Sequence, residues 1–598
     1  MMKPLSRHPL LFGTACVILA GGVFSGCSDF LEDAAAPQGT LDDKTLATRA
    51  GVEGTLIGAY RTLDCTTATN ADWGCAASNW VWASVAADDS YKGSDGSDQP
   101  PINDIEGYHW GTPNAESYLN TKWSHLYEGV VRSNNTIRLL KQVTASSSEI
   151  PAADADAIEG EALFLRAHYH FEAWRMWGRI PYYKEDDTDF RKANATSAEV
   201  VTALLADLDA AIAKLPLTPR NGQKGRVTRW TAKAYKGRVQ VYAGQFAAAV
   251  TTLQDVRANG PYALQPSYDQ VWSGYQEYSN GPETILAYQA SANDGEPNGD
   301  NANWGERLNF PYSGSHFGCC GFNQPTQNLV NFFRVDAAGL PLALSDPANW
   351  NASNANMTAA TVPLVDPRLD WTVGRDGVPY KDWGPHSSTG GWVRDVANGG
   401  PYSPKKNAHE KASNAEQLSG GWAPTQQNSI NMHLYRYADM LLLLAEALVE
   451  TNDLAGATAI VNQIRARAGV TAQGPGTDRA TTAVAINSPS ITWATYRVGQ
   501  YPVFASQAFA RSAVRAERRL ELALEGQRLF DLRRWQIADA TLNAYINGVG
   551  GGAERTRRLY KASAEAFAAK HALYPIPQIQ IQLSRVGGQD RLTQNPGW

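Results

Sequence analysis

Apolar residues recur at helical spacing over roughly the first 260 residues and again after about residue 430. Between these two blocks, from about Tyr262 to Asn431, the chain is rich in Gly, Pro, Asn, Ser and Trp and has few periodic runs. So long a stretch without regular structure is usually either functional or disordered, and its aromatic content favours order. The pattern predicts a mostly α fold in which helical pairs wrap around an irregular, loop-rich lobe with a few short strands.

Two segments, Tyr242–Ala249 and Glu450–Ala457, indicate how the helices are paired. In each, one helix ends, small or polar residues turn the chain, and alanines open the next helix. Tetratricopeptide-like pairs have this pattern, although the period is too irregular for a regular array. We expect Thr228 to cap one helix and Gly244 to separate two. The predicted helices are approximately Leu46–Leu63, Glu116–Lys141, Ala155–Trp177, Ser197–Lys214, Thr228–Ala243, Gln245–Asn259, Met432–Thr451, Leu454–Ala468 and Ser506–Gly526.

Residues 1–26 have the features of a secretory signal peptide. Lys3 and Arg7 precede an apolar run, Leu10 to Phe24, that is too short to span a bilayer. Small residues directly before Cys27 resemble the lipobox of bacterial lipoproteins, which implies that Cys27 becomes the lipidated first residue of the mature chain. Each buried methylene of an acyl chain adds roughly 0.8 kcal/mol, so several chains anchor a protein firmly. A signal peptide cleaved elsewhere and a membrane-spanning helix are the alternatives.

The remaining residues, 27–598, are expected to form a single domain. It would consist of a helical part (27–261), an irregular aromatic-rich ligand lobe (262–431) and a second helical part (432–598). The leader has two basic and no acidic residues, so its removal changes the formal net charge from −6 to −8. This mild acidity, without a long basic run, argues against nucleic acid as a partner.

The cysteines point to an oxidising compartment if the chain is exported. Cys16 leaves with the leader and Cys27 is lipidated on this interpretation, and the four others are Cys65, Cys75, Cys319 and Cys320. Four cysteines allow three pairings. We favour Cys65–Cys75, which closes a short loop, with Cys319–Cys320 as an adjacent pair. A crossed arrangement and a zinc site that uses His316 are the alternatives.

A series of short motifs runs from the leader to the last residue. One is a W-x3-Y pattern at Trp123 and Tyr127, with an Asn further on. The others are Cys27–Glu32, Glu161–Ala167, Trp177–Pro181, Gly225–Thr228, Ala445–Ala447, Asn462–Gly469, Glu517–Arg528, Asp531–Trp535, Leu573–Pro577 and Gln594–Trp598. In this order they resemble the SusD/RagB family of outer-membrane nutrient-binding lipoproteins. The match is nearly absent in the irregular middle of the chain.

The resemblance implies a non-catalytic, mostly helical protein that is lipid-anchored in the outer membrane and faces outside. It also implies a SusC-like TonB-dependent transporter as the partner, which the lipoprotein covers like a lid. The ligand would be a glycan or its oligosaccharides, or a peptide. The motif residues themselves are expected to serve packing and capping. Arg518 and Glu521 are three residues apart on a helix, as are Glu525 and Arg528, so each pair is expected to form an ion pair across one turn.

A sugar-binding surface needs flat aromatic faces and polar side chains. Two regions supply both, one from Trp73 to Trp110 and the other in the irregular middle. Tyr108 and Trp110 are two residues apart, so an extended segment would place both rings on one face. Core packing is the alternative for each ring. The candidate ligand-binding residues are Trp80, Tyr91, Tyr108, Trp110, Trp272, Tyr275, Trp304, Arg307 and Trp392.

Other chemistry has weak support in the sequence. The acidic run Asp88–Asp98 could bind calcium, but it lacks the EF-hand spacing, so a solvated loop is favoured and no cofactor is expected. The chain has no H-E-x-x-H, G-x-S-x-G or Walker-type motif. Two alternatives to nutrient capture are a secreted glycan hydrolase with carboxylates in the middle lobe and a non-catalytic helical scaffold of the envelope.

Overall fold

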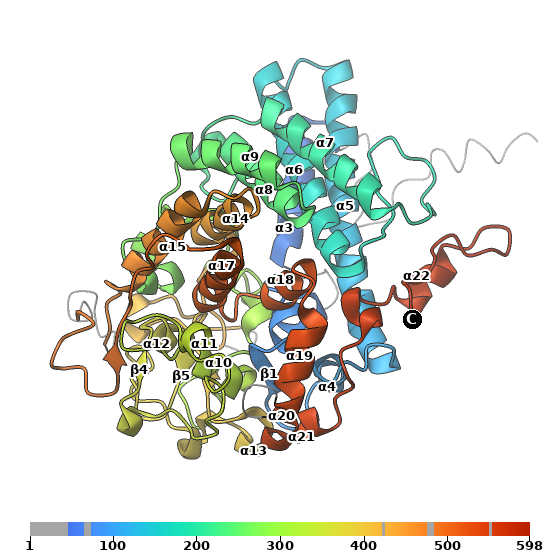
Figure 1. The fold of residues 1–598 in the computed structure, drawn as a ribbon. Helices are drawn as coiled ribbons and strands as arrows, with labels where there is room; N and C mark the ends of the chain where they lie inside the picture. The colour runs from blue at the N-terminus through green and yellow to red at the C-terminus, as the bar shows by residue number, and fades with distance from the viewer. Residues whose placement is uncertain (1–45, 65–72, 421–424, 475–483, 549–552) are drawn as a thin grey trace, which may run out of the picture.

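The protein is mostly helical, with a few very short strands, which confirms the predicted fold class (Figure 1). The structure is a computed structural model that describes residues 46–64, 73–420, 425–474, 484–548 and 553–598. The predictions for the leader, for lipidation at Cys27 and for Cys65 fall outside these residues. None of the helices in the described ranges is both long and apolar enough to traverse a lipid bilayer.

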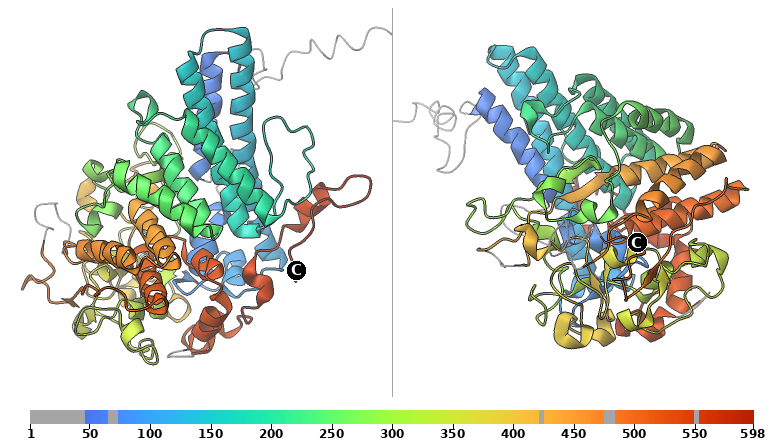
Figure 2. Two further views of the ribbon diagram at one scale, coloured as in Figure 1. Left: turned by 45° about the horizontal axis from the view of Figure 1, so that its top comes forward. Right: turned by 90° about the vertical axis from the view of Figure 1, so that its left-hand side faces the viewer.

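The N-terminal helices stack on one another in chain order (Figures 1 and 2). Gly129 lets the two longest helices approach closely, because a Cβ there would meet the ring of Tyr169 at 2.5 Å. As predicted, the Thr228 side chain accepts a hydrogen bond from the Thr231 amide, and Gly244, with φ of 71°, turns the chain between two helices. These helices are α3 (Arg49–Arg61), α5 (Pro113–Ser146), α6 (Ala152–Trp177), α7 (Ser197–Lys214), α8 (Arg229–Tyr242) and α9 (Phe246–Asn259).

The C-terminal helices join this stack through α14 (Tyr437–Glu450), which packs against α9, against α15 (Leu454–Ala468) and against α17 (Gln507–Leu522). Every residue of α14 from Tyr437 to Val449 is buried, as expected for a helix that is covered on all sides. After α17 come α18 (Arg528–Arg534) and α19 (Ala538–Asn547). The two helical blocks therefore share one continuous core.

Three predicted helix ends are wrong by four or five residues, and one of them is the end of α5, which was predicted at Lys141 and lies at Ser146. The segment Met432–Arg436 is not helical but forms β7, which pairs antiparallel with β2 (Thr284–Tyr288). A short apolar run does not by itself distinguish a buried strand from the start of a helix. The helix predicted to reach Gly526 ends at Leu522.

The middle of the chain consists of short elements and turns. Its strands pair with one another or with strands from outside this region. The pairs β1 (Ser90–Gly93) with β3 (Phe322–Pro325) and β5 (Val373–Gly374) with β6 (Ser403–Pro404) are antiparallel, and β4 (Leu364–Val365) with β8 (Thr495–Tyr496) is parallel. The remaining short helices are α4 (Pro100–Glu106), α10 (Gln327–Phe332), α11 (Leu342–Ser345), α12 (Leu369–Thr372), α13 (Val396–Gly399), α20 (Glu554–Arg557), α21 (Leu559–Ala562) and α22 (Gln578–Leu583).

Buried ion pairs attach this irregular lobe to α17. Arg368 pairs with Glu517 at 2.7 Å and with Glu521 at 2.8 Å, and all three side chains are fully buried. Arg436 pairs with the same Glu521 at 2.7 Å. Because an unpaired charge in the interior is very costly, these contacts fix the lobe relative to the helix.

The predicted pairing within α17 is wrong. Arg518 pairs with Asp439 at 2.8 Å and with Asp531 at 2.9 Å, rather than with Glu521. Glu525, which lies just after the helix, pairs with Arg436 and Lys406, and Arg528 pairs with Asp88. These side chains are buried, so their partners come from other segments of the fold and not from the next turn of the same helix.

Candidate functional site

Most of the candidate ligand-binding rings lie in the interior. Tyr108 packs against Trp110 and Phe567, with ring centroids 6.1 and 5.3 Å away, and the Trp110 indole donates a hydrogen bond to the Ile105 carbonyl at 2.9 Å. Tyr108 has a φ of 63°, so its segment is not extended and the argument for an exposed pair fails. A ring with no exposed face cannot stack on a ligand. The buried residues, with exposed fractions between 0 and 7%, are Trp80, Tyr91, Tyr108, Trp110, Trp272 and Trp392.

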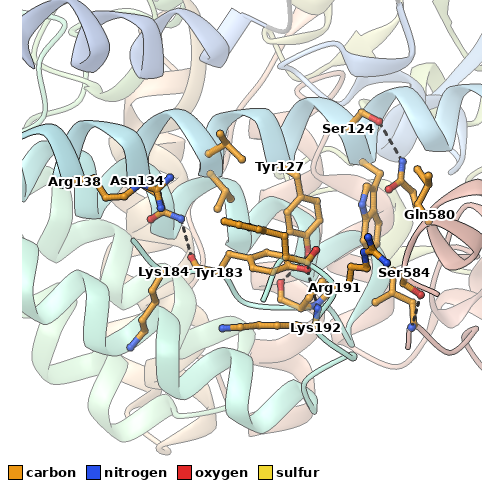
Figure 3. A pocket seen from close by; sticks show the side chains of 17 residues that line it. Ser124, Tyr127, Asn134, Arg138, Tyr183, Lys184, Arg191, Lys192, Gln580 and Ser584 are labelled. Carbon is orange, nitrogen blue, oxygen red and sulfur yellow. Dashed lines mark hydrogen bonds between the residues drawn. The ribbon is translucent and has the colours of Figure 1, made fainter. Parts of the chain in front are cut away.

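Two places on the described surface combine aromatic rings with polar side chains and a hollow. The first is a groove of about 490 Å³ between α5, the segment 181–192 that follows α6, and residues 580–592 near the C-terminus (Figure 3). None of the candidate residues lines it. The exposed Phe190 within a run of charged residues is the sequence signal that could have indicated it.

The second place is a pair of stacked indoles, Trp73 and Trp304. Their ring centroids are 6.0 Å apart and their planes are inclined by 18°. Trp73 belongs to the short turn η2 (Trp73–Cys75) and Trp304 to the turn η7 (Trp304–Glu306), so the pair joins the two predicted aromatic regions. Both rings are partly exposed. Trp73 was not among the candidate residues, whereas Trp304 was.

Hydrogen bonds from neighbouring segments hold η7 in place. The indole of Trp80 donates to the Gly305 carbonyl at 3.2 Å, and the indole of Trp304 donates to the Asp300 carboxylate at 2.9 Å. The buried Trp80 is therefore a support for this turn rather than a contact for a ligand. With its indole nitrogen occupied, Trp304 has its ring orientation fixed before any ligand arrives.

Arg307 stacks on both indoles. Its guanidinium lies over the ring of Trp304 and 5.3 Å from the centroid of Trp73. Burial lowers the pKa of Arg307 to about 9, against the opposing effect of Asp300, so the group is still charged at neutral pH. A cation held against aromatic faces stiffens both rings. Arg307 thus belongs to the site as a support beneath the rings.

A hollow of about 230 Å³ has Asn301, three residues before Trp304, in its lining. Arg61 lines this hollow and donates to the carbonyl of Asp300, the residue whose carboxylate holds the Trp304 indole. Its lining is largely apolar, with Asp64, Ser291, Asp294 and Asn301 among its polar residues. Asp300 therefore connects this hollow to the turn that carries Trp304, although neither indole lines the hollow itself. Tyr275, the remaining candidate, is partly exposed in the segment before the turn Gln276–Tyr278.

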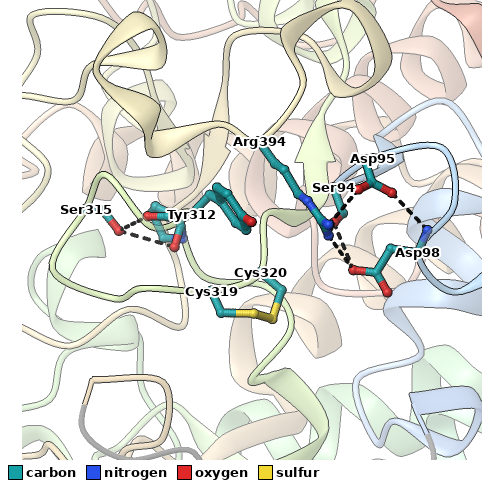
Figure 4. The surroundings of a disulfide bond; sticks show 9 residues. Ser94, Asp95, Asp98, Tyr312, Ser315, Cys319, Cys320 and Arg394 are labelled. Atoms are coloured by element: carbon teal, nitrogen blue, oxygen red, sulfur yellow. Dashed lines mark hydrogen bonds and ion pairs between the residues drawn. A yellow bond between two sulfur atoms is a disulfide. The ribbon is translucent and has the colours of Figure 1, made fainter.

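The expected adjacent disulfide, Cys319–Cys320, is present, and its two residues are joined by a cis peptide bond (Figure 4). Because both sulfurs are bonded, neither is available to a zinc ion with His316. Cys75 is also disulfide-bonded, and its expected partner Cys65 lies outside the described residues.

The acidic run near this disulfide is neutralised by basic side chains of the protein. Arg394 pairs with Asp95 at 2.6 Å and with Asp98 at 2.8 Å, and its guanidinium lies 5.2 Å from the ring of Tyr312 (Figure 4). Asp88 and Asp89 are not in a solvated loop as predicted, but are buried in ion pairs with Arg519 and Arg528. Within the described ranges, no group of three or more His, Cys, Asp or Glu side chains is arranged to hold a metal ion.

Comparison with known proteins identifies the family. The SusD family model matches residues 282–598, and a second model, described as starch-binding and associating with the outer membrane, matches residues 76–241. The chain belongs to the SusD family. The resemblance inferred from the motifs is thereby confirmed.

Several relatives are similar to this chain over most of their length. A SusD-like protein of Formosa agariphila is 24% identical over 553 residues, which cover 90% of this chain and 93% of that protein. A solved structure called a laminarin-binding SusD-like protein has a TM-score of 0.63 at 22% identity, covering 92% of this chain and all of that one. Surface glycan-binding protein A from Bacteroides thetaiotaomicron, solved with laminarihexaose, has a TM-score of 0.63 at 18% identity, covering 92% and 99%.

Proposed function

We propose that this protein is a lipid-anchored lipoprotein on the outer face of the outer membrane that captures glycans or their oligosaccharides. It then delivers them to a SusC-like TonB-dependent transporter. The observation that carries the proposal is the partly exposed Trp73–Trp304 pair, fixed by Arg307 and connected through Asp300 to a hollow that contains hydrogen-bonding side chains. The lipoprotein-like leader with Cys27 and the family's description as associating with the outer membrane support the location.

The geometry suits sugars for a simple reason. One face of a pyranose ring presents C–H groups, which stack on an indole, while its hydroxyl groups need hydrogen-bond partners at the ring's edge. The two indoles supply the first need and the side chains around Asn301 and Asp294 the second. Relatives whose names specify laminarin and laminarihexaose make β-glucans the first ligands to test.

Capture without catalysis fits the environment of Glu306, the carboxylate that belongs to the same turn as Trp304. Glu306 follows Trp304 within η7 and is buried, and burial raises its pKa. It accepts hydrogen bonds from Ser78, from Asn309 at 2.9 Å and from Asn407 at 3.1 Å. A carboxylate so fully engaged in holding the turn is not placed to act on a glycosidic bond.

The test is to titrate the mature protein with laminarihexaose, laminarin, starch and a peptide mixture by calorimetry, while released reducing sugar is measured. We expect saturable binding of at least one glycan and no release. Trp304→Ala should weaken that binding about tenfold, because one stacked ring is worth about 1–2 kcal/mol. Phe509→Ala, at an exposed aromatic position far along the chain, is the matched control.

Three results would contradict parts of the proposal. Release of reducing sugar by the pure protein would favour the hydrolase. Binding of peptides alone would change the ligand class. Equal glycan affinity of Trp304→Ala and the unaltered protein would remove the indole pair from the site. The partner is tested separately, by asking whether a TonB-dependent receptor co-purifies from solubilised outer membranes.

A further inference from the structure

The groove shown in Figure 3 is aromatic inside and basic at its edge. Four rings line it: Trp123 and Tyr127 from α5, and Tyr183 and Phe190 from the segment after α6. Val130, Val131, Leu583 and Leu592 complete the apolar wall. A volume of about 490 Å³ lies within the range typical of sites for small organic ligands, about 300–1,000 Å³.

Hydrogen bonds hold the groove open without a ligand. The hydroxyl of Tyr127 donates to the Pro181 carbonyl at 2.8 Å, and the hydroxyl of Tyr183 donates to the Phe190 carbonyl at 3.0 Å. The two rings meet edge to face, with centroids 5.9 Å apart. Since both hydroxyl groups are engaged with the backbone, the rings turn their apolar parts toward the hollow (Figure 3).

Residues 580–592, which form another wall of the groove, are hydrogen-bonded to the segment 181–192. The guanidinium of Arg191 donates to the Arg585 carbonyl at 3.0 Å, which connects the loop after α6 to the C-terminal residues. Gln580 donates to Asn120 on α5 at 2.8 Å. Three segments far apart in sequence are therefore held at a fixed separation, as a preformed site requires.

Large apolar side chains are left uncovered around this hollow. Phe190 is 69% exposed, Leu583 is 62% exposed and Val131 is 46% exposed. A contiguous exposed apolar patch that is rimmed by polar residues commonly marks a binding surface. An occupant of the groove would remove these side chains from water.

The charged side chains that line the groove are all basic, although Asp187 and Asp189 lie between them in the same segment. Its lining includes Arg138, Lys184, Arg191 and Lys192 and no acidic side chain. Lys192 pairs with Asp187 at 2.5 Å, whereas within the described part of the chain Arg138, Lys184 and Arg191 have no ion pair. An anionic group at this rim would gain charge-assisted hydrogen bonds from these exposed cations.

We propose that the groove is a second binding site, for a small amphipathic anion with an aromatic or alkyl body and a carboxylate, sulfate or sulfonate head. The body lies between Tyr127, Tyr183 and Phe190, and the head reaches Lys184 or Arg191. This site is independent of the indole pair and of the proposed glycan capture.

The experiment uses the mature protein and three soluble probes. Binding of 8-anilinonaphthalene-1-sulfonate is followed by fluorescence, and 4-phenylbutyrate and its uncharged counterpart 4-phenyl-1-butanol compete for the site. We expect saturable binding and about tenfold stronger competition by the acid than by the alcohol. Phe190→Ala should weaken the binding of all three probes about tenfold, since one large apolar contact is lost. The double variant K184E/R191E, which also removes the Arg191–Arg585 contact, should weaken binding of the two anions more than binding of the alcohol.

Controls separate this site from the rest of the surface. Val503→Ala removes an equally exposed apolar side chain elsewhere, and Lys224→Glu reverses an exposed charge elsewhere, so both should bind the probes as the unaltered protein does. Trp304→Ala should also leave the probes unaffected, which distinguishes failure here from failure of glycan capture.

Several outcomes would overturn the inference. One is the absence of saturable binding, and another is binding that Phe190→Ala and K184E/R191E leave unchanged. Binding to phosphatidylglycerol vesicles but not to the free probes would instead make the groove a membrane contact. If Phe190→Ala abolished co-purification with an envelope protein while no probe bound, the occupant would be a polypeptide.

Discussion

Arg307 lies over the indole of Trp304 and links it to Trp73, so that two turns about 230 residues apart in sequence form one rigid aromatic surface. Arg307 is therefore expected to matter for ligand binding although it lies beneath the rings and does not contact the ligand itself. The guanidinium orders the rings in advance and thereby reduces the entropy that a ligand would otherwise lose in ordering them.

Replacing Arg307 by Met should therefore weaken glycan binding about fivefold while the melting temperature changes little. The loss corresponds to a cation–π contribution of about 1 kcal/mol. Stability is spared because Met avoids the desolvation that lowers the pKa of Arg307 to about 9. Calorimetric titration and thermal unfolding give the two readouts, with Arg497→Met as the exposed control. An unchanged dissociation constant would contradict the role of Arg307.

Trp110→Ala should destabilise the protein by about 3–5 kcal/mol, because the ring is fully buried between Tyr108, His571 and Tyr574. This is the opposite of what an exposed binding residue would show. In thermal unfolding, the melting temperature of Trp110→Ala should be far below that of Val503→Ala, which alters an exposed side chain. Normal stability together with lost glycan binding would restore Trp110 to the ligand site.

Glu521→Gln should lower the free energy of unfolding by about 3 kcal/mol or more. Burial alone would raise the pKa of Glu521, but Arg467, Arg436 and Arg368 outweigh it and keep the carboxylate ionised. Removing its charge leaves the three arginines with too little countercharge in the interior. Glu565→Gln, in an exposed pair with Lys570, is the control and should cost less than about 1 kcal/mol. Similar urea midpoints for the two variants would contradict this prediction.

The free energy of unfolding should fall as the pH is lowered from about 6.5 to about 4. Burial lowers the pKa of His125, and likewise of His168, to about 4, so between these pH values the unfolded chain binds more protons than the folded one. Stability therefore rises with pH through this window, is complete above it, and is lost below it. Each histidine contributes about 1–3 kcal/mol to the change.

Urea unfolding at pH 4.5 and 7.5 checks this dependence. His125→Gln should make the difference between the two pH values smaller, because one buried titrating group is gone. His316→Gln, at an exposed position, should leave the difference as it is. A difference that is the same in all three proteins would show that the buried imidazoles do not control acid sensitivity.

Helices whose signals are local could be predicted closely from the sequence. The predicted bounds of α7 and α15 agree with the structure, because capping residues and apolar spacing lie within the segment itself. Ion pairs between residues that are far apart in the sequence were not predicted. Arg518 has an acidic neighbour one turn away, yet its partners come from Asp439 and Asp531, which only the folded chain brings near.

At the candidate site, too, contacts between distant segments could not be predicted from the sequence. The two aromatic-rich regions that the sequence indicated meet in the structure at Trp73 and Trp304, and their role in ligand binding stays a prediction. Aromatic content could not tell which rings face outward, since that depends on backbone turns such as the positive φ of Tyr108. The groove at Phe190 was missed because its walls come from three segments, none of which has a distinctive motif for binding.

The buried ion pairs between the lobe and α17 have a consequence for how the protein is made. Arg368 and Arg436 are synthesised well before Glu517 and Glu521. The carboxylates of α17 that pair with these arginines are therefore added to the chain last. Until then Arg368 has Asp366 and Arg436 has Glu283 as acidic partners, but the ion pairs that attach the lobe to α17 are missing. A chain interrupted before α17 would therefore keep these two local pairs and lose the contacts that fix the lobe against the helix.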